Sequence, residues 1–410
     1  MLGREPGEGR ARAPPGYRRF DARGVQYVWR LKVPLYGEAD AVYIWNRTLV
    51  DQLVGVQGFV QSQHDPCLFL KQLADGSSID VCVHVDDGFV TDSGSPLADA
   101  EMDTLNAAFR DKYGADGVVL KEPKHFLGQN IVVHSPTRVT ISSRAYVTQL
   151  AAKYLPAPLA EYAKCTTPCL KGMVEAYEEA VTRSDLLDSA GTQAYASKTG
   201  AAIFAGSASR CDALYALGMC ARCLTFPTAA MDACVNRVIA YLANTADQGV
   251  TYDGSRPNAM VYEAYSDSDW CVAHSTTGAV HCVGGRVISA SSKRQVSIAL
   301  SSTEAEIMAA SLAGAEIMYL RGVLRDLAYD VSEPTVLWVD NSGAVELTKR
   351  RESAVRSRHI ERRYLKIREW VAEGHIVAKY KPTADNHADM FTKPLPPDVF
   401  FYHRSELMGA

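Results

Sequence analysis

Several features that would assign a protein class at once are scarce or missing in this 410-residue chain. It shows no signal-peptide pattern and no apolar run of the roughly 20 residues that a membrane helix needs, so we expect a reducing intracellular setting and no membrane partner. Basic residues are not in excess, because 43 Lys and Arg stand against 47 Asp and Glu. The net charge of −4 therefore does not by itself indicate nucleic-acid binding. With 47% hydrophobic and 22% charged residues, the composition excludes a disordered chain and predicts two or three globular domains.

Zinc-site spacing is also missing among the ten cysteines. One C-x-x-C pair, Cys220 and Cys223, is present, and no second pair follows at the distance of a zinc ribbon. The pair lies in an apolar stretch with helical spacing, which contains Ala213, Leu214, Leu217 and Leu224. We therefore expect buried free thiols.

What the chain does have is a set of acidic residues at the ends of predicted elements. Residues 260–265 alternate with the period of a β-strand, and this strand is predicted to end at Asp267. Thr335–Val339 is a second short strand, ending at Asp340 and followed by a short helix. Two aspartates thus leave the sheet at strand ends.

Three more strands complete the predicted sheet. Residues 279–283 and 286–291 flank Gly284-Gly285, a dipeptide typical of hairpin turns. Residues 375–381 form the last strand. With helices between the later strands, this order predicts a mixed sheet covered by helices.

A long helix carries the third acid, Glu306. The pairs Ser301/Glu304 and Thr303/Glu306 both fit the spacing of a capping box at its start. Glu306 also heads an apolar stripe of residues three or four apart: Ala310, Ala313, Ile317, Leu320, Leu324 and Leu327. A carboxylate on that stripe is costly to bury unless it is paired or bound to a metal, so Glu306 is either a metal ligand or a helix cap.

The fourth acid, Asp389, lies in a predicted final helix that Asp385 would cap. Before it, residues 357–373 form a predicted helix with Gly374 at its C-terminal cap. Magnesium prefers carboxylate, water and phosphate oxygens, and two such ions can activate a water and stabilise a leaving oxygen. The four acids therefore suit a two-metal nuclease.

Basic residues are concentrated near the proposed site although the whole chain is acidic. Residues 349–368 hold nine Lys and Arg against two Glu. A segment of this kind is either a solvated helix face or a track for nucleic-acid phosphates. The candidate phosphate-binding residues are Arg356, Arg358, Arg362 and Arg363.

At this point the motifs carry a resemblance to a known family. Four segments look like the ribonuclease H region of copia-type LTR retrotransposon Pol polyproteins: Tyr265–Trp270, Ser301–Glu306, Val339–Asn341 and Ala388–Leu395. The resemblance implies that Asp267, Glu306, Asp340 and Asp389 are catalytic and bind two Mg²⁺ ions. It also implies an RNA–DNA hybrid as substrate.

The segments before residue 150 resemble the reverse transcriptase of the same family. They are Pro14–Tyr17, Trp29–Lys32, Leu35–Gly37, Asp65–Phe69 and Phe126–Gly128. Asp86-Asp87 would then be the catalytic aspartate pair, with Asp86 a metal ligand. Considered alone, Asp87-Gly88 between two strands is a hairpin turn.

Two departures from the family pattern bear on polymerisation. His84 stands where the family usually has Tyr, and no Asp precedes Pro14 to supply the other metal ligand. Asp21 comes too late in the chain to replace it. We expect the fingers to be missing and the chain alone not to polymerise DNA.

The predicted fold class is a multidomain mixture of α/β and α+β. We expect a disordered start (1–16), a partial reverse-transcriptase palm (17–150) and a thumb or connection region (151–258). A ribonuclease H-like mixed sheet flanked by helices (259–397) and a C-terminal tail (398–410) follow.

The predicted function is Mg²⁺-dependent hydrolysis of RNA in RNA–DNA hybrids. Expected partners are the hybrid, template–primer nucleic acid and other products of the polyprotein, in the cytoplasm or virus-like particles, with entry into the nucleus. The alternatives are a catalytically silent nucleic-acid-binding relic and a related integrase or transposase. The last usually has its glutamate after two aspartates, whereas Glu306 comes second here.

Overall fold

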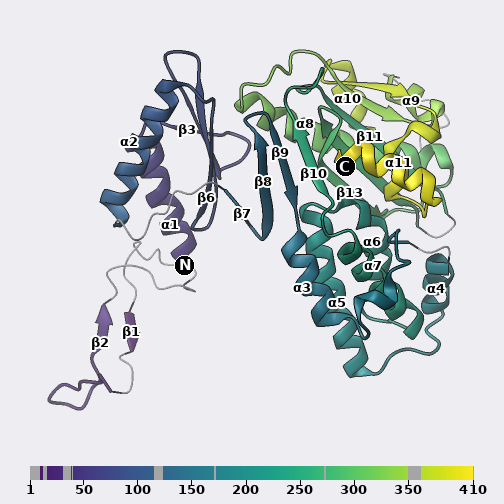
Figure 1. Cartoon of the computed structure of the whole chain (residues 1–410), viewed down its shortest axis with the longest axis horizontal. Helices are drawn as coiled ribbons and strands as arrows, with labels where there is room; N and C mark the ends of the chain where they lie inside the picture. The colour runs from purple at the N-terminus through teal and green to yellow at the C-terminus, as the bar shows by residue number, and fades with distance from the viewer. Residues whose placement is uncertain are drawn as a thin grey trace. The chain divides into compact units, whose positions relative to one another are not determined.

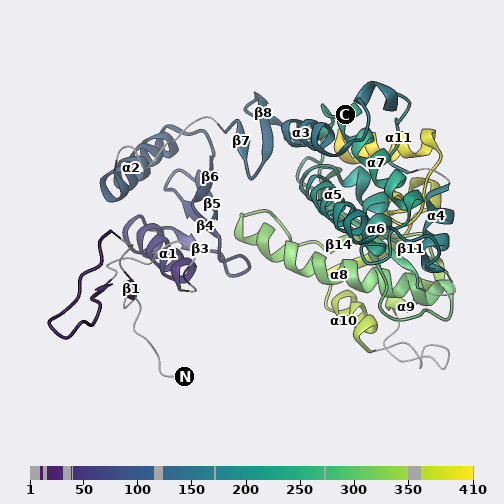
Figure 2. The same ribbon diagram turned by 90° about the horizontal axis from the view of Figure 1, so that it is seen from below.

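The computed structural model describes residues 10–12, 16–30, 38, 40–114, 123–169, 172–271, 274–349 and 362–409. The chain divides into two compact units, Met1–Lys121 and Glu122–Ala410. Figures 1 and 2 show the helices and strands of each unit from two directions.

The first unit is built on a four-stranded antiparallel sheet of order β3-β4-β5-β6. Its strands are β3 (Val60–Gln61), β4 (Leu68–Gln72), β5 (Ser78–His84) and β6 (Asp87–Asp92). Its helices are α1 (Ala41–Val50), the π-helix η1 (Asp51–Val56) and α2 (Pro96–Tyr113). Leu53, Phe59, Phe69 and Ile79 are buried in the core that joins them.

A short two-stranded ribbon precedes this sheet. It pairs β1 (Arg10–Arg12) with β2 (Val28–Arg30) in antiparallel register. Because β1 lies within residues 1–16, the expectation of a fully disordered start was wrong for these three residues. The other residues before Gly16 lie outside the described part of the chain.

The second unit begins with another antiparallel sheet, of order β10-β9-β8-β7. Its strands are β7 (His125–Phe126), β8 (Gln129–Ser135), β9 (Arg138–Ser142) and β10 (Gly249–Asp253). Between β9 and β10 the chain forms the helices that Figure 1 shows gathered together. They are α3 (Arg144–Tyr154), η2 (Leu159–Tyr162), α4 (Gly172–Val181), α5 (Ser189–Ala208), η3 (Cys211–Ala213), α6 (Leu214–Arg222) and α7 (Ala229–Asn244).

The predicted state of the cysteine pair is confirmed in these helices. Cys220 and Cys223 are both buried and both free. Burial raises the pKa of each thiol, to about 11 for Cys223, so neither is a thiolate at neutral pH.

The last part of the chain forms a five-stranded sheet of order β13-β12-β11-β14-β15. The strands are β11 (Tyr262–Asp269), β12 (Thr276–Val283), β13 (Arg286–Arg294), β14 (Thr335–Val339) and β15 (Ile376–Tyr380). The first three pair antiparallel, whereas β14 and β15 run parallel to β11. The predicted mixed sheet is confirmed, and β11 extends two residues beyond the predicted end at Asp267.

The predicted hairpin turn at Gly284-Gly285 is also confirmed. Both glycines have positive φ angles, 61° and 75°, which a two-residue turn between twisted strands requires. This turn fixes the register of β12 against β13.

Helices cover both faces of the five-stranded sheet. The long helix α8 (Ser302–Asp326) packs on one face with α9 (Ser342–Lys349), η5 (Arg362–Leu365) and α10 (Ile367–Ala372). The other face packs against α6, η7 (His387–Phe391) and α11 (Pro397–Met408). A further 3₁₀ turn, η6 (Thr383–Asp385), connects β15 to η7.

Among the described helices, α8 is long and apolar enough to cross a membrane, judged by length and composition alone. The expectation that the chain has no apolar run of this length was therefore wrong for α8. Most of its apolar window is buried within the fold, as in the core helix of a soluble protein. Ala310, Ala313, Ile317 and Leu324 of the predicted stripe are buried against the sheet. Figure 2 shows the short helix α10 lying beside part of the much longer α8.

Two predictions about the C-terminal elements need correction. Residues 357–361 of the predicted helix 357–373 lie outside the described residues, and the rest splits into η5 and α10. Tyr364 of η5 and Ile367 of α10 are both buried in the core. Gly374 follows α10 with a φ of 77°, as predicted. The expected tail, residues 398–410, is mostly α11, whose Leu407 and Met408 are buried.

The predicted cap of the final helix was also wrong, because Asn386 and not Asp385 caps η7. The side-chain oxygen of Asn386 accepts a hydrogen bond from Ala388 N, and its Nδ2 donates to Ser266 O at 3.0 Å. A carboxylate could not make the second bond, since it has no hydrogen to donate.

Candidate metal centre

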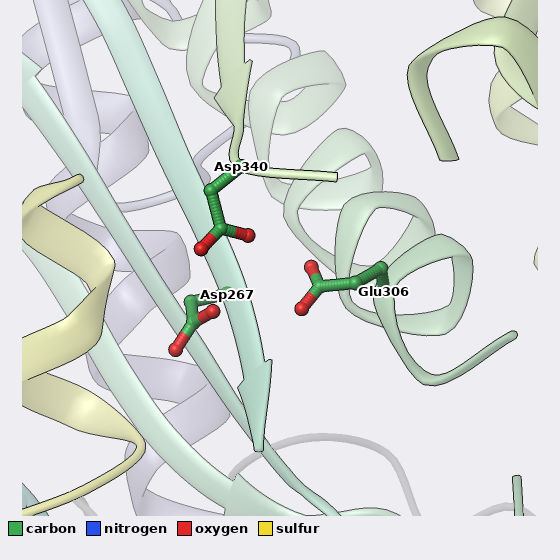
Figure 3. A group of neighbouring side chains, drawn as sticks. All are labelled: Asp267, Glu306 and Asp340. Atoms are coloured by element: carbon green, nitrogen blue, oxygen red, sulfur yellow. The ribbon is translucent and has the colours of Figure 1, made fainter. Parts of the chain in front are cut away.

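Three of the four predicted acids come together at one end of the five-stranded sheet. One carboxylate oxygen from each of Asp267, Glu306 and Asp340 lies within 4.8 Å of the other two. Figure 3 shows the three side chains pointing toward one another, from a strand, a helix and the chain just past a strand. Among the described residues no other group of three His, Cys, Asp or Glu side chains meets this closely.

The strand register explains why the two aspartates meet. β11 and β14 are parallel neighbours, and Ser266 pairs with Val339. The next residue along the chain is an acid in both cases, so Asp267 within β11 and Asp340 just past β14 lie side by side at the carboxyl end of β14. Sites in sheets with parallel strands are commonly built at this edge.

The third acid comes from α8. Ser268 N donates a hydrogen bond to Glu306 Oε1 at 3.0 Å, which holds the carboxylate against β11. Capping of α8 is done by other residues: Ser301 Oγ accepts from Glu304 N at 3.2 Å, and Glu304 Oε2 accepts from Leu300 N at 2.8 Å. Glu306 is therefore not the helix cap.

The electrostatics of Glu306 show a carboxylate without a counter-charge of its own. Its side chain is buried, and Oε2 has no hydrogen-bond partner. Burial, followed by the charges of Asp267 and Asp340, raises its pKa to about 10. Burial and Asp267 also raise the pKa of Asp340, whose Oδ2 accepts from Thr383 Oγ1 at 2.9 Å. Such a set of oxygens is stabilised by a bound divalent cation.

Asp389 lies beside this trio but not within it. Its carboxylate, carried by η7, pairs with Lys393 Nζ at 2.8 Å through Oδ2, while its Oδ1 is buried without a partner. Lys393 Nζ is also 4.0 Å from Asp267 Oδ2. Burial and Asp267 raise the pKa of Asp389 to about 7.

Three residues of the centre were missed by the sequence analysis. Thr392 Oγ1 donates a hydrogen bond to Asp267 Oδ2, and Lys393 pairs with two of the acids. Both lie three or four residues after Asp389 in a motif already noted, and the four-residue step from Asp389 to Lys393 was an available signal. Gly278, which lies opposite Asp267 in β12, gave no signal in the sequence.

Gly278 lets η7 approach the sheet. A Cβ at this position would lie 2.7 Å from both Ala388 O and Thr392 Cγ2, which is closer than real contacts allow. The backbone of η7, with Asp389 on it, can therefore reach β12 only because residue 278 has no side chain.

We expect Gly278→Ala to lower the free energy of unfolding by about 1–3 kcal/mol, because the added methyl group must displace η7. The measurement is urea denaturation of the metal-free chain. Gly200→Ala in α5 is the matched control, since no atom lies within 4 Å of its added Cβ and alanine favours helix. Equal losses in the two variants would refute the packing argument.

The predicted polymerase aspartates lie in the first unit, on the hairpin of β5 and β6. His84 pairs with Asp87 there, so Val85 and Asp86 make the turn, and Asp87-Gly88 belongs to β6 instead. Trp45 Nε1 donates a hydrogen bond to Val85 O. Asp86 and Asp87 are exposed, and in the described part of the chain they join no group of three metal-binding side chains.

The predicted phosphate-binding arginines cannot be placed in the same detail. Arg356 and Arg358 lie outside the described residues. Arg362 and Arg363 begin η5, of which the backbone is described.

Comparison with known proteins decides the family. A family model described as "Reverse transcriptase (RNA-dependent DNA polymerase)" matches residues 11–171. The Pol polyprotein of transposon RE2 from Arabidopsis thaliana is 30% identical over 97% of this chain and 26% of its own length. The chain belongs to the Pol polyproteins of copia-type retrotransposons. This confirms the family that the motifs indicated.

The copia-type relatives differ in how much of them the chain covers. It spans about a quarter of the length of the RE2 polyprotein and of the related RE1 polyprotein, to which it is 28% identical. A transposon Ty5-1 protein from Saccharomyces cerevisiae is 28% identical over 73% of this chain and 92% of its own length.

A solved foamy viral protease–reverse transcriptase, in complex with double-stranded DNA, is 12% identical with a TM-score of 0.44. It covers 91% of this chain, which covers 52% of it. This similarity is too weak to define the fold or the ligands of this chain.

Proposed function

We propose that this copia-type chain carries a ribonuclease H-like nuclease in residues 259–397, which hydrolyses the RNA strand of RNA–DNA hybrids with two Mg²⁺ ions. The observation that carries the proposal is the convergence of Asp267, Glu306 and Asp340 at the end of a mixed five-stranded sheet. The order of the acids along the chain and the family motifs around them support it.

The residues present fit magnesium. All candidate ligands are carboxylates, which are the hard oxygen donors that Mg²⁺ prefers. Two buried oxygens, Glu306 Oε2 and Asp389 Oδ1, have no hydrogen-bond partner and are free to coordinate. One ion would be held by Asp267, Glu306 and Asp340, and a second by Asp267 and Asp389. When bound, such ions supply an activated water and charge stabilisation for the leaving 3′ oxygen.

The protein's own contribution is to hold these carboxylates in place. Ser268 N, Thr383 Oγ1 and Thr392 Oγ1 each donate a hydrogen bond to a different acid of the trio. Each acid therefore keeps one oxygen fixed by the fold and another available. Preorganised groups of this kind avoid the cost of reorganisation during the reaction.

We also propose which residues bind the nucleic acid and whether the chain polymerises DNA. Arg356, Arg358, Arg362 and Arg363 are proposed to contact the phosphates of the hybrid, with little sequence preference and strong salt dependence. We propose that Asp86 and Asp87 do not support DNA polymerisation by this chain alone. They have no third carboxylate beside them among the described residues.

The test is an assay on a labelled RNA–DNA hybrid with the full 410-residue chain. We expect RNA cleavage that requires Mg²⁺, stops with EDTA and leaves 3′-hydroxyl and 5′-phosphate ends. Single-stranded RNA and DNA duplex should stay intact, and primer extension in parallel should yield no product. Hybrid binding without Mg²⁺-dependent turnover would refute the nuclease and favour the silent nucleic-acid-binding relic.

A further inference from the structure

Lys393 is the basic residue that the described part of the chain places against the acidic centre. Its Nζ lies 2.8 Å from Asp389 Oδ2 and 4.0 Å from Asp267 Oδ2. The lysine side chain is 39% exposed, whereas the two carboxylates are 4–5% exposed. The ammonium therefore reaches from the surface into the buried acids.

The centre consists of two unequal halves. In the first, Asp267, Glu306 and Asp340 meet with no basic side chain paired to Glu306 or Asp340 among the described residues, and Glu306 Oε2 lacks any partner. In the second, the ammonium of Lys393 lies between Asp267 and Asp389. A divalent ion can enter the first half without displacing any positive group.

A divalent ion that enters the second half must displace the ammonium of Lys393 from Asp389. A Mg²⁺ ion binds carboxylate oxygens at about 2.1 Å, so it cannot share Asp389 Oδ2 with an ammonium in contact with the same oxygen. Two positive charges a few ångströms apart also repel strongly where little water screens them. Because the side chain of Lys393 is partly exposed, the ammonium has a route out into solvent.

We infer that the ammonium of Lys393 occupies the site of the second divalent cation until that ion binds. Without nucleic acid, the chain binds one ion at Asp267, Glu306 and Asp340, and takes the second only when Lys393 leaves Asp389. This rests on the proposed two-ion nuclease and adds the order in which its ions are loaded. Lys393 is then a positioning residue that sets the affinity of the second site.

A purely structural role for Lys393 makes a different prediction. A lysine four residues after an aspartate commonly forms a salt bridge that only stabilises the fold. Its loss would lower the unfolding temperature but leave the number of bound ions and their affinities unchanged.

The experiment counts ions on the full chain without nucleic acid. Mn²⁺ is titrated with free ion measured by electron paramagnetic resonance, and Mg²⁺ by calorimetry. In the wild type we expect one tight ion. Lys393→Met should tighten the second site at least about tenfold, because a nearby positive charge has been removed. Lys393→Gln removes the same charge and keeps a polar side chain, in case the methionine variant folds poorly.

Two controls keep the charge argument separate from packing. Lys393→Arg retains the charge and should bind ions as the wild type does. Lys379→Met removes an exposed lysine from β15 and should also leave both affinities unchanged. As a second readout, the rise in unfolding temperature on adding Mg²⁺ should be larger in Lys393→Met than in the wild type.

The outcomes separate this inference from the function on which it rests. Equal ion numbers and affinities in the wild type and both charge-removing variants would overturn the role of Lys393 and leave the nuclease standing. Failure of every variant and the wild type to bind any ion would overturn the nuclease and the inference together.

Discussion

Asp267→Asn should reduce hybrid cleavage by at least about 10³-fold, as large a loss as we expect from any single substitution. Asp267 is the acid that touches both halves of the centre: it groups with Glu306 and Asp340 and shares Lys393 with Asp389. An amide at this position is neutral and a poor ligand for a hard cation. Its loss therefore weakens both proposed ion sites at once.

The measurement is the initial rate of cleavage of a labelled hybrid at saturating Mg²⁺. Asp398→Asn, an exposed aspartate at the start of α11, is the matched control and should keep the wild-type rate within about twofold. Purifying both variants alongside the wild type also measures contamination by host nucleases. A wild-type rate in Asp267→Asn would remove this residue from the proposed ligands.

Glu306→Gln should separate activity from stability. We expect cleavage to fall by at least about 10³-fold, because the neutral amide cannot replace a charged ligand. The fold should survive, since a glutamine oxygen can still accept the hydrogen bond from Ser268 N. Glu304→Gln is the neighbouring control: Glu304 caps α8 through Leu300 N, so this variant should keep its activity.

The pH dependence of metal-free stability gives a second readout of Glu306. Folding raises the pKa of this carboxyl from its ordinary value of 4.5 to about 10, so the folded chain favours the protonated form. That stabilisation is complete below pH 4.5 and is lost as the pH rises toward 10. In EDTA at pH 8, Glu306→Gln should therefore unfold about 2 °C or more above the wild type.

The difference in unfolding temperature between Glu306→Gln and the wild type should widen as the pH rises from 5 to 9. Thermal unfolding followed by circular dichroism measures this difference. Saturating Mg²⁺ should reverse the order, because the ion stabilises only the chain that binds it. A gap independent of pH would mean that Glu306 is not a buried, charge-strained carboxyl.

Local patterns account for much of the five-stranded sheet and its long helix. The alternation before Asp267 predicted β11, and Gly284-Gly285 predicted the turn between β12 and β13. These features depend on residues close together in the chain, where the period of side chains and the turn chemistry act directly. Four of the six apolar residues on the stripe headed by Glu306 are buried, for the same reason.

Two errors concern local choices, one decided by a distant strand and one by the pairing of neighbouring strands. Asn386 rather than Asp385 caps η7, because Ser266 O in β11 needs a hydrogen-bond donor. The turn of the β5–β6 hairpin lies at Val85-Asp86 rather than at Asp87-Gly88, because the strand register places Asp87 opposite His84.

By itself, the sequence determined the family, the order of strands and helices around the acids, and the chain positions of the four carboxylates. Only the tertiary structure decided which of them share a pocket, that an ammonium lies between Asp267 and Asp389, and that a glycine opposite Asp267 admits η7. The physical reason is distance along the chain. Residues tens to more than a hundred positions apart meet only through the packing of the whole unit, and the unpartnered oxygen of Glu306 exists only once that packing has excluded water.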